Sequence, residues 1–397
     1  MRWDIFCRVV DNYGDAGVCW RLARQLAAEH HFDVTLWIDR LATLARLEPA
    51  IDSQAMRQRH RSVTLCALDA GDAGVSGAGS SVAAASGPAE SGVVAFDPAP
   101  VVVEGFGCGL PQPYLDAMEA QVRPPVWFNL EYLSAEPWID DVHGLASQHP
   151  LRRLVRYFWF PGFTSKSGGL IREAGLLDAR GVSGEGSGAA GSDHGADVSA
   201  ASELVIVLFC YPNRALPAMF ELWSRGDSRV RCIIPEGVAT DAVSTWLGSA
   251  LPPVPRIVTR GKLALDLRPF CTQDAFDQLL RISDVNFVRG EDSFVRAQWA
   301  AKPFVWQPYP QEAGAQLAKL NAFLDRYAPG VIDAAQAAQR RLAVAFNVED
   351  ARGAVSAWPA FRASLPVLAA HARRWAAAQA ALPDLACGLV AFARAHL

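Results

Sequence analysis

The chain has 397 residues, of which 51% are hydrophobic and 20% are charged. This length and composition exclude a disordered chain and fit two globular domains of roughly 150 to 200 residues each. The formal net charge of -4 supplies no global attraction to a polyanion, so we do not expect a nucleic-acid partner.

The sequence also predicts where the protein works. No apolar run reaches about 18 residues, and the first residues lack the apolar region and cleavage site of a signal peptide. We therefore expect no membrane association. The eight cysteines form no C-x-x-C pair and mostly lie in apolar segments, which favours a reducing cytoplasm and argues against a structural zinc site.

The first half begins with a strand, helix and strand unit. The pattern predicts a strand at 3–10, a helix at 16–30 with Val18, Leu22 and Leu26 on one face, and a second strand at 34–38. Further predicted strands lie at 63–68, 101–103, 126–130 and 155–160. These strands are continuously apolar, which is typical of a parallel sheet covered on both faces.

The second half repeats this rhythm. Its predicted strands lie at 204–210, 230–234, 263–267, 285–288 and 304–306. Its clearest predicted helices lie at 273–281, 293–301 and 312–327. Beyond about residue 331 the sequence is rich in alanine and helical to its end.

Two stretches, 70–95 and 178–202, consist mainly of glycine, alanine and serine, and we interpret both as flexible surface insertions. The second also marks the join between a first domain at 1–200 and a second domain at 201–397. The predicted fold class is α/β, with two doubly wound Rossmann-like domains facing a cleft. Ligands bind at the carboxyl ends of the strands in such folds.

The loop between the first strand and the first helix carries two acids, Asp11 and Asp15, together with Gly14 and Gly17. One interpretation is a tight turn in which Asp15 caps the helix. The second acid at the strand end favours a proton acceptor and a cation-orienting group instead. The loop lacks G-x-G-x-x-G and its acids would repel a pyrophosphate, so they face a cation or a group that loses a proton.

A second segment, Arg289, Gly290, Glu291, Asp292 and Ser293, follows a strand and opens a helix. A plain capped helix is one interpretation. The other is a diphosphate site, because the helix start offers N–H groups and a positive dipole end, and Arg289 adds a permanent charge. The following turn, strand and proline-rich loop through Tyr309 resemble the nucleotide-sugar half of two-domain glycosyltransferases.

A third set comprises Phe209, Tyr211, Gln273 and Phe276, all near the ends of predicted elements. Aromatic faces can sandwich a base, and an amide can bind a pyrimidine edge through one donor and one acceptor. Each residue alone is more often part of a hydrophobic core. Only their convergence would form a base pocket.

The segments 6–18 and 20–26 in the first half and 286–293 in the second resemble the signature blocks of the elongation factor P arginine rhamnosyltransferases. The segments 129–134 and 307–311 match further pieces of that family. The resemblance covers most of the chain except the two stretches rich in glycine, alanine and serine.

The resemblance implies a GT-B glycosyltransferase that moves rhamnose from dTDP-β-L-rhamnose to an arginine of elongation factor P, with inversion and without a metal or other cofactor. Asp11, Asp15 and Glu291 match the family's catalytic positions, with Glu291 near the donor sugar and ribose. The thymidine, ribose and diphosphate positions match these residues, with Tyr13, Gly14 and Gly290 beside them: Phe209, Tyr211, Gln273, Phe276, Arg289, Asp292, Ser293 and Tyr309.

This reaction faces a chemical difficulty, because a guanidinium has delocalised nitrogen electrons and a pKa above about 12. Two carboxylates can orient it and take its proton as the C–N bond forms. We expect Asp15 to be the general base and Asp11 the orienting group, with the exchanged roles as the alternative.

Two other functions remain open on sequence alone. One is a GT-B glycosyltransferase with a different nucleotide-sugar donor and a small-molecule or lipid acceptor. The other is a non-catalytic nucleotide sensor or scaffold of the same shape.

Overall fold

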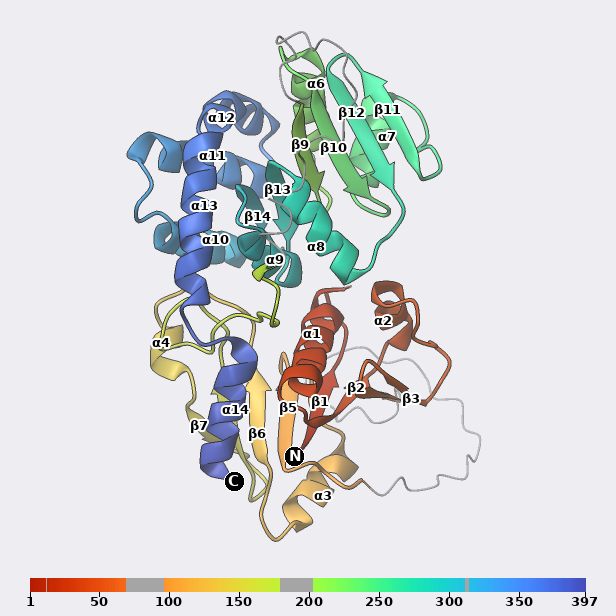
Figure 1. Cartoon of the computed structure of the whole chain (residues 1–397), viewed down its shortest axis with the longest axis vertical. Coiled ribbons are helices and arrows are strands. Elements are labelled where there is room, and N and C mark those ends of the chain that lie inside the picture. Colours follow the sequence, from red (N-terminus) through yellow and green to blue (C-terminus); the bar gives the residue numbers. More distant parts are fainter. Residues whose placement is uncertain (12, 69–95, 179–202, 311–313) are drawn as a thin grey trace.

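The computed structural model of the chain has two lobes, each built around one sheet (Figure 1). The structure describes residues 1–11, 13–68, 96–178, 203–310 and 314–397. The two stretches predicted as insertions fall outside these ranges, apart from Asp178 at the edge of the second.

The first sheet has eight strands in the order β3-β4-β2-β1-β5-β6-β8-β7. They are β1 (Arg2–Cys7), β2 (Asp33–Ile38), β3 (Arg57–His60), β4 (Val63–Ala67), β5 (Val101–Gly105), β6 (Val126–Leu130), β7 (Ala146–Gln148) and β8 (Val155–Trp159). All neighbours pair in parallel except the edge strands β3 and β7, which are antiparallel. The chain winds outward in both directions from β1 and β5.

The second sheet has six strands in the order β11-β12-β10-β9-β13-β14. They are β9 (Leu204–Leu208), β10 (Val230–Pro235), β11 (Arg256–Arg260), β12 (Leu263–Arg268), β13 (Val285–Arg289) and β14 (Phe304–Gln307). Here β11 is the single antiparallel edge among the described strands. The winding reverses between β9 and β13.

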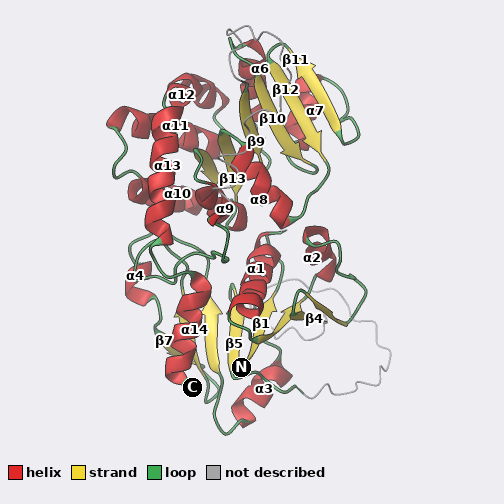
Figure 2. Cartoon of the chain, in the orientation of Figure 1, coloured by secondary structure: helices red, strands yellow, loops and turns green. Residues whose placement is uncertain are grey.

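Helices cover the sheets of both lobes (Figure 2). The first part of the chain forms α1 (Gly14–Glu29), α2 (Leu41–Leu47), α3 (Gln112–Ala120) and α4 (Ile139–Val142). The second part forms α6 (Leu216–Arg225), α7 (Thr240–Leu247), α8 (Gln273–Ile282), α9 (Asp292–Ala300), α10 (Ala315–Tyr327), α11 (Asp333–Asn347), α12 (Ala351–Ala363), α13 (Leu365–Ala380) and α14 (Leu385–His396).

The predicted doubly wound α/β architecture is confirmed. Val126–Leu130 has the predicted bounds, and the other predicted strands are present with ends shifted by one to three residues. The central strands read as apolar because helices cover both faces, and every residue of β5 and β6 is buried. The predicted helix at 312–327 is α10, whose described part begins at Ala315.

Three strands were missed, and all are antiparallel edges: β3, β7 and β11. An edge strand has a neighbour on one side only and keeps much of its surface in water. Accordingly, none of these three strands contains a buried residue. Their sequences therefore lack the apolar run that indicates a central strand.

The helix α14 packs against the first lobe, although it follows the second lobe in the sequence. Leu385, Leu389 and Val390 of α14 belong to the same buried cluster as Trp3 and Phe128 of the first sheet, and Figure 1 shows α14 beside β6. The first lobe therefore includes residues beyond the domain boundary placed at 200. In return, Phe163 and Leu170 pack in the core of the second lobe.

The segment Leu365–His396 is apolar and long enough to cross a membrane by composition alone. In the structure it is divided, because α13 ends at Ala380 and α14 begins at Leu385. Both helices have buried faces, formed by residues such as Leu368 and Ala376 in α13 and Leu389 in α14. The apolar residues thus pack against the two lobes.

Gly169 packs against the loop between α13 and α14, and this contact predicts the effect of a substitution. Gly169 has φ +73°, and an added Cβ would lie 2.3 Å from the Pro383 carbonyl oxygen. Gly175 has φ +76° with nothing within 4 Å of an added Cβ. We expect Gly175→Ala to lower the free energy of unfolding by about 1 kcal/mol through backbone strain alone, and Gly169→Ala to lower it by about 2–4 kcal/mol because a steric clash is added.

Denaturant titration of both variants measures the difference. Equal losses of stability would show that α14 moves away from Gly169 without cost.

Candidate active site

The carboxyl ends of the two parallel sheets face each other across the gap between the lobes (Figure 1). Asp11 follows β1, and Tyr211 and Arg289 lie at the ends of β9 and β13. These are the points where the winding of each sheet reverses, which is where open α/β folds bind ligands. The predicted cleft residues therefore come together.

Asp11 bridges the two lobes. Its Oδ2 accepts a hydrogen bond of 2.7 Å from the Tyr211 hydroxyl of the second lobe. An added Cβ at Gly14 or at Gly290, which has φ +59°, would lie 2.9 Å from that same oxygen. Both glycines are thus required for the carboxylate to fit. Burial raises the pKa of Asp11, while the Tyr211 hydrogen bond and Arg289 oppose the rise.

Asp15 is buried at 2% exposure on the first turn of α1. Its Oδ2 accepts hydrogen bonds of 2.8 Å from the backbone N–H groups of both Val10 and Asp11. The carboxylate therefore organises the preceding loop, and no side chain caps α1, contrary to the capping interpretation. Burial raises the pKa of Asp15, and the neighbouring Asp11 charge adds to this effect.

Glu291 stands immediately before α9, at the boundary of the lobes. Its Oε1 accepts a hydrogen bond of 2.9 Å from the Leu133 backbone N–H of the first lobe. Loss of solvation raises the pKa of Glu291 to about 8, with smaller opposing contributions from the Leu133 N–H and Lys319. The side chain therefore holds its proton at neutral pH.

Two cavities adjoin these three acids. The first is lined by Asp11, Tyr13, Gly14, Leu47, Phe209, Pro235, Phe270, Cys271, Gln273, Phe276, Arg289, Gly290, Glu291, Asp292 and Ser293. The second is lined by Val10, Asp11, Gly14, Asp15, Val18, Phe106, Tyr132, Leu133, Gly290, Glu291, Trp306, Pro308, Tyr309 and Lys319. They share Asp11, Gly14, Gly290 and Glu291, so the two cavities adjoin each other at these residues.

The first cavity combines aromatic rings with a cation. The rings of Phe209 and Phe276 lie 4.8 Å apart, and those of Tyr13 and Phe270 lie 4.9 Å apart. The Arg289 guanidinium stacks over Phe209 at 4.5 Å and donates a hydrogen bond to the Cys210 carbonyl oxygen. Such a cavity suits a flat ring joined to an anion.

The predicted diphosphate residues are held by contacts within the protein. Ser293 Oγ donates to the Arg289 carbonyl oxygen and accepts from the Arg289 N–H. The Asp292 carboxylate binds Arg21 and the Gln273 amide. Asp292 and Ser293 at the start of α9 nevertheless line the first cavity, and the start of a helix carries free N–H groups and a positive dipole end.

The second cavity has an aromatic wall that includes Tyr132 stacked on Phe106 at 4.6 Å. Lys319 lies 5.7 Å from the Tyr132 ring centre. Burial raises the pKa of Tyr132 above its ordinary value, with Asp15, Glu291 and Asp11 adding to the rise. Asp11 and Asp15 together make this space suitable for a cationic group.

Thirteen of the fourteen predicted site residues line one cavity or both. The exception is Tyr211, which lies just behind them and contacts Asp11 and Arg289. Phe270, Phe106 and Lys319 were not predicted, because a lone aromatic or lysine carries no local signal. Among the residues that the structure describes, no group of three or more His, Cys, Asp or Glu side chains could hold a metal ion.

A family model and two protein relatives are similar to this chain over almost its whole length. Residues 3–394 match the family model described as Elongation-Factor P (EF-P) rhamnosyltransferase EarP. The protein-arginine rhamnosyltransferase of Pseudomonas putida is 44% identical over 398 residues, covering 100% of this chain and 99% of the relative. That of Pseudomonas aeruginosa is 42% identical over 393 residues, covering 98% of each.

A solved structure is also similar to this chain over its whole length. It concerns the structural basis for EarP-mediated arginine glycosylation of translation elongation factor EF-P, and it is 34% identical to this chain with a TM-score of 0.65. The match covers 100% of this chain and 99% of that chain.

The raised pKa of Glu291 makes a prediction for stability. The folded-state pKa of about 8 exceeds the ordinary value of 4.5, so between these pH values the unfolded chain releases a proton that the folded chain keeps. The free energy of unfolding should therefore fall as pH rises through this window. We expect Glu291→Gln to lack this part of the fall, measured by denaturant titration at several pH values between 5 and 8.5. Parallel profiles for the two proteins would contradict the assignment.

Proposed function

The chain belongs to the EarP family of elongation factor P rhamnosyltransferases, and we propose that its donor is dTDP-β-L-rhamnose and that transfer occurs where the two cavities meet. The protein is a protein-arginine rhamnosyltransferase of the GT-B type, and elongation factor P is its acceptor. The proposal concerns the donor and the role of each side chain.

The nucleobase would occupy the first cavity. Phe209 and Phe276 offer ring faces, and Gln273 Oε1 is buried without a hydrogen-bond partner in the structure. A thymine ring carries an N–H donor for that oxygen, and its methyl group suits the aromatic surface. An unpaired buried acceptor costs free energy, so a base that satisfies it is favoured.

The diphosphate would lie over the start of α9. Arg289 and the dipole end of this helix provide positive charge there. The Asp292 carboxylate is neutralised by Arg21, which lies 2.7 Å away, and so repels the diphosphate less. The same charges would stabilise the departing dTDP.

The acceptor arginine would enter the second cavity. The protein contacts of Asp11 and Asp15 fall on Oδ2 of each, so Oδ1 of each carboxylate can bind one side of the guanidinium. A raised pKa also makes each carboxylate a better base. We assign the general base to Asp15 and guanidinium orientation to Asp11.

The reaction would then proceed in one displacement. A guanidinium nitrogen attacks the anomeric carbon from the face opposite the diphosphate and forms the C–N bond. The bond from that carbon to the phosphate oxygen breaks, dTDP leaves with the electron pair, and Asp15 takes the nitrogen-bound proton. Inversion follows from attack on the opposite face. Glu291, neutral at pH 7, would donate a hydrogen bond to a sugar hydroxyl.

The observation that carries this mechanism is the position of Asp11 and Glu291, which come from different lobes and line both cavities. The sugar must lie where both can reach it.

We also propose a cytoplasmic location, since the acceptor is a translation factor, and fractionation of cells that express the tagged chain would test it.

The first prediction of the mechanism concerns the acids. Incubation with elongation factor P and dTDP-β-L-rhamnose should add one deoxyhexose to the acceptor, as read by intact-mass analysis. Asp11→Asn and Asp15→Asn should each slow this gain by about 100-fold or more, because proton transfer to a positioned base is lost. Asp227→Asn, on the exposed loop after α6, is the control and should react at the normal rate. Normal rates for both Asp11→Asn and Asp15→Asn would show that these two acids take no part in catalysis.

The second prediction concerns the donor. A ligand that binds only the folded state raises its melting temperature, so dTDP should stabilise the protein more than UDP does at equal concentration. The reason is that the thymine methyl is buried against Phe209 and Phe276. Phe276→Ala should reduce the shift caused by dTDP. A larger shift with UDP would overturn the thymidine assignment.

A further inference from the structure

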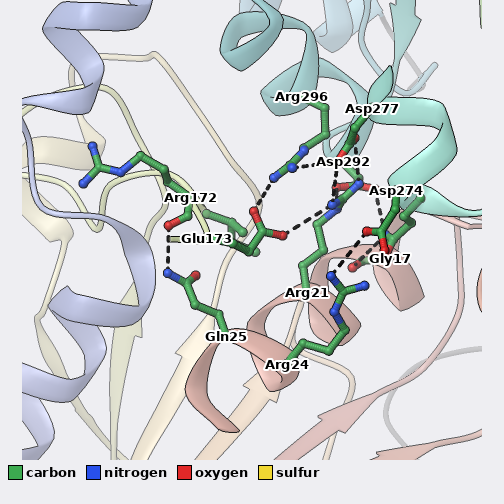
Figure 3. Close-up of polar contacts among 12 residues, drawn as sticks. Gly17, Arg21, Arg24, Gln25, Arg172, Glu173, Asp274, Asp277, Asp292 and Arg296 are labelled. Atoms are coloured by element: carbon green, nitrogen blue, oxygen red, sulfur yellow. Dashed lines mark hydrogen bonds and ion pairs between the residues drawn. The ribbon is translucent and has the colours of Figure 1, made fainter. Parts of the chain in front are cut away.

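A cluster of largely buried charges joins the two lobes (Figure 3). We call it the interlobe cluster, and it consists of Arg21, Glu173, Asp277, Asp292 and Arg296. Arg21 comes from α1 of the first lobe, Asp277 from α8, and Asp292 and Arg296 from α9 of the second. Glu173 lies on the segment between β8 and β9.

Arg21 is the centre of the cluster and is only 1% exposed. Two of its nitrogens donate to the two oxygens of Asp277 at 3.1 Å each, and its Nε donates to Asp292 Oδ1 at 2.7 Å. A weaker contact of 3.4 Å reaches Glu173. Arg296 contacts Glu173 at 2.5 Å and Asp277 at 2.6 Å. Among the described residues, Arg296 thus shares two of the three acids with Arg21 but forms no hydrogen bond or ion pair with Asp292.

Glu173 keeps its negative charge in this cluster. The two arginines lower the pKa of Glu173 to about 2, against the effect of its burial. A buried ion pair is weak evidence for stability, since apolar packing can join two surfaces as well. The hydrogen bonds of this cluster also fix the directions of its side chains. One of these side chains, Asp292, lines the first cavity.

Asp292 in turn orients Gln273. The Gln273 amide nitrogen donates to Asp292 Oδ2 at 3.0 Å and to the Gly17 carbonyl oxygen at 3.2 Å. Both partners accept only, so the NH₂ end of the amide must face them. The amide oxygen then faces away from both, and it is buried without a partner.

Gly17 provides the space for this arrangement. An added Cβ would lie 2.9 Å from Gln273 Nε2 and 3.2 Å from Asp292 Oδ2. A larger residue on this face of α1 would therefore displace the amide. Gly17 and Arg21 are four residues apart on one helix, so the first lobe holds Gln273 directly through the Gly17 carbonyl and indirectly through Arg21 and Asp292.

We propose that Arg21 is a positioning residue for nucleobase recognition: through Asp292 it fixes the amide of Gln273 so that the amide oxygen faces a pyrimidine ring N–H. This inference rests on the proposed nucleotide donor. It adds that the first lobe, through Arg21 and Gly17, completes the base site of the second lobe. Recognition of the base is therefore complete only when the lobes are in contact.

The test measures dTDP binding by calorimetry to the wild type and to matched variants of the full chain. Arg21→Lys keeps the charge but loses the planar set of donors, and it should weaken dTDP binding by about 3- to 10-fold, the loss expected for one hydrogen bond. Arg296→Lys makes the same change in the same cluster and should leave dTDP affinity within about 2-fold, even if it lowers the melting temperature equally.

A double-mutant cycle separates positioning from general destabilisation. Gln273→Leu removes the amide, so adding Arg21→Lys to it should cause almost no further loss of dTDP affinity. If Arg21→Lys weakens binding equally in both backgrounds, or if Arg296→Lys weakens it as much as Arg21→Lys does, the proposal is wrong.

Two further outcomes are distinguishable. If Arg21→Lys does not fold, Gly17→Ala tests the same orientation without changing a charge, and it should weaken dTDP binding in the wild-type background but not beside Gln273→Leu. If the wild type fails to bind dTDP, or if Gln273→Leu binds it normally, the proposed base site fails first. If dTDP binding depends on Gln273 but not on Arg21 or Gly17, the proposed base site stands and only the positioning role of Arg21 is wrong.

Discussion

The burial of the Arg21 guanidinium is the constraint on which the relation of the two lobes depends. A cation that is 1% exposed needs anionic partners, and those of Arg21 all come from later parts of the chain. The pairing holds α1 against α8 and α9, and in this arrangement Tyr211 reaches Asp11 and Glu291 reaches the Leu133 N–H. Loss of Arg21 would remove the guanidinium that Asp277 and Asp292 share, and breaking such a buried pair costs about 3–5 kcal/mol.

Contact between the lobes also accounts for the electrostatics of the site. Asp11, Asp15 and Glu291 lose water when the carboxyl ends of the two sheets meet, and each has a raised pKa for that reason first. The carboxylates of Asp11 and Asp15 make the second cavity attractive to a cation, while Arg289 and the start of α9 make the first attractive to an anion. In the proposed mechanism, the arginine and the sugar diphosphate would therefore meet between the two cavities.

The sequence predicts features that are local and misses those that depend on distant pairing. Central strands such as β6 are recognisable because both faces are buried, whereas β3 (RQRH) has no buried residue and gains its partner only in the sheet. Asp11 and Asp15 stand out because two acids share one loop. Arg21 lies in a block that resembles the family, but Asp277 is 256 residues away, and no local pattern links them. Asp292 is consistent with a helix cap from its spacing, and only the fold shows that its carboxylate binds Arg21 and Gln273.

The position of α14 has a consequence for how the protein is made. Synthesis on the ribosome proceeds from the N-terminus, so β1 to β8 emerge long before Leu385, Leu389 and Val390, which complete the core around Trp3 and Phe128. The nascent first sheet must wait with an apolar face uncovered until α14 has been synthesised. Termination before α14 would thus damage the earliest part of the molecule, and the order of synthesis differs from the order in which the lobes become complete.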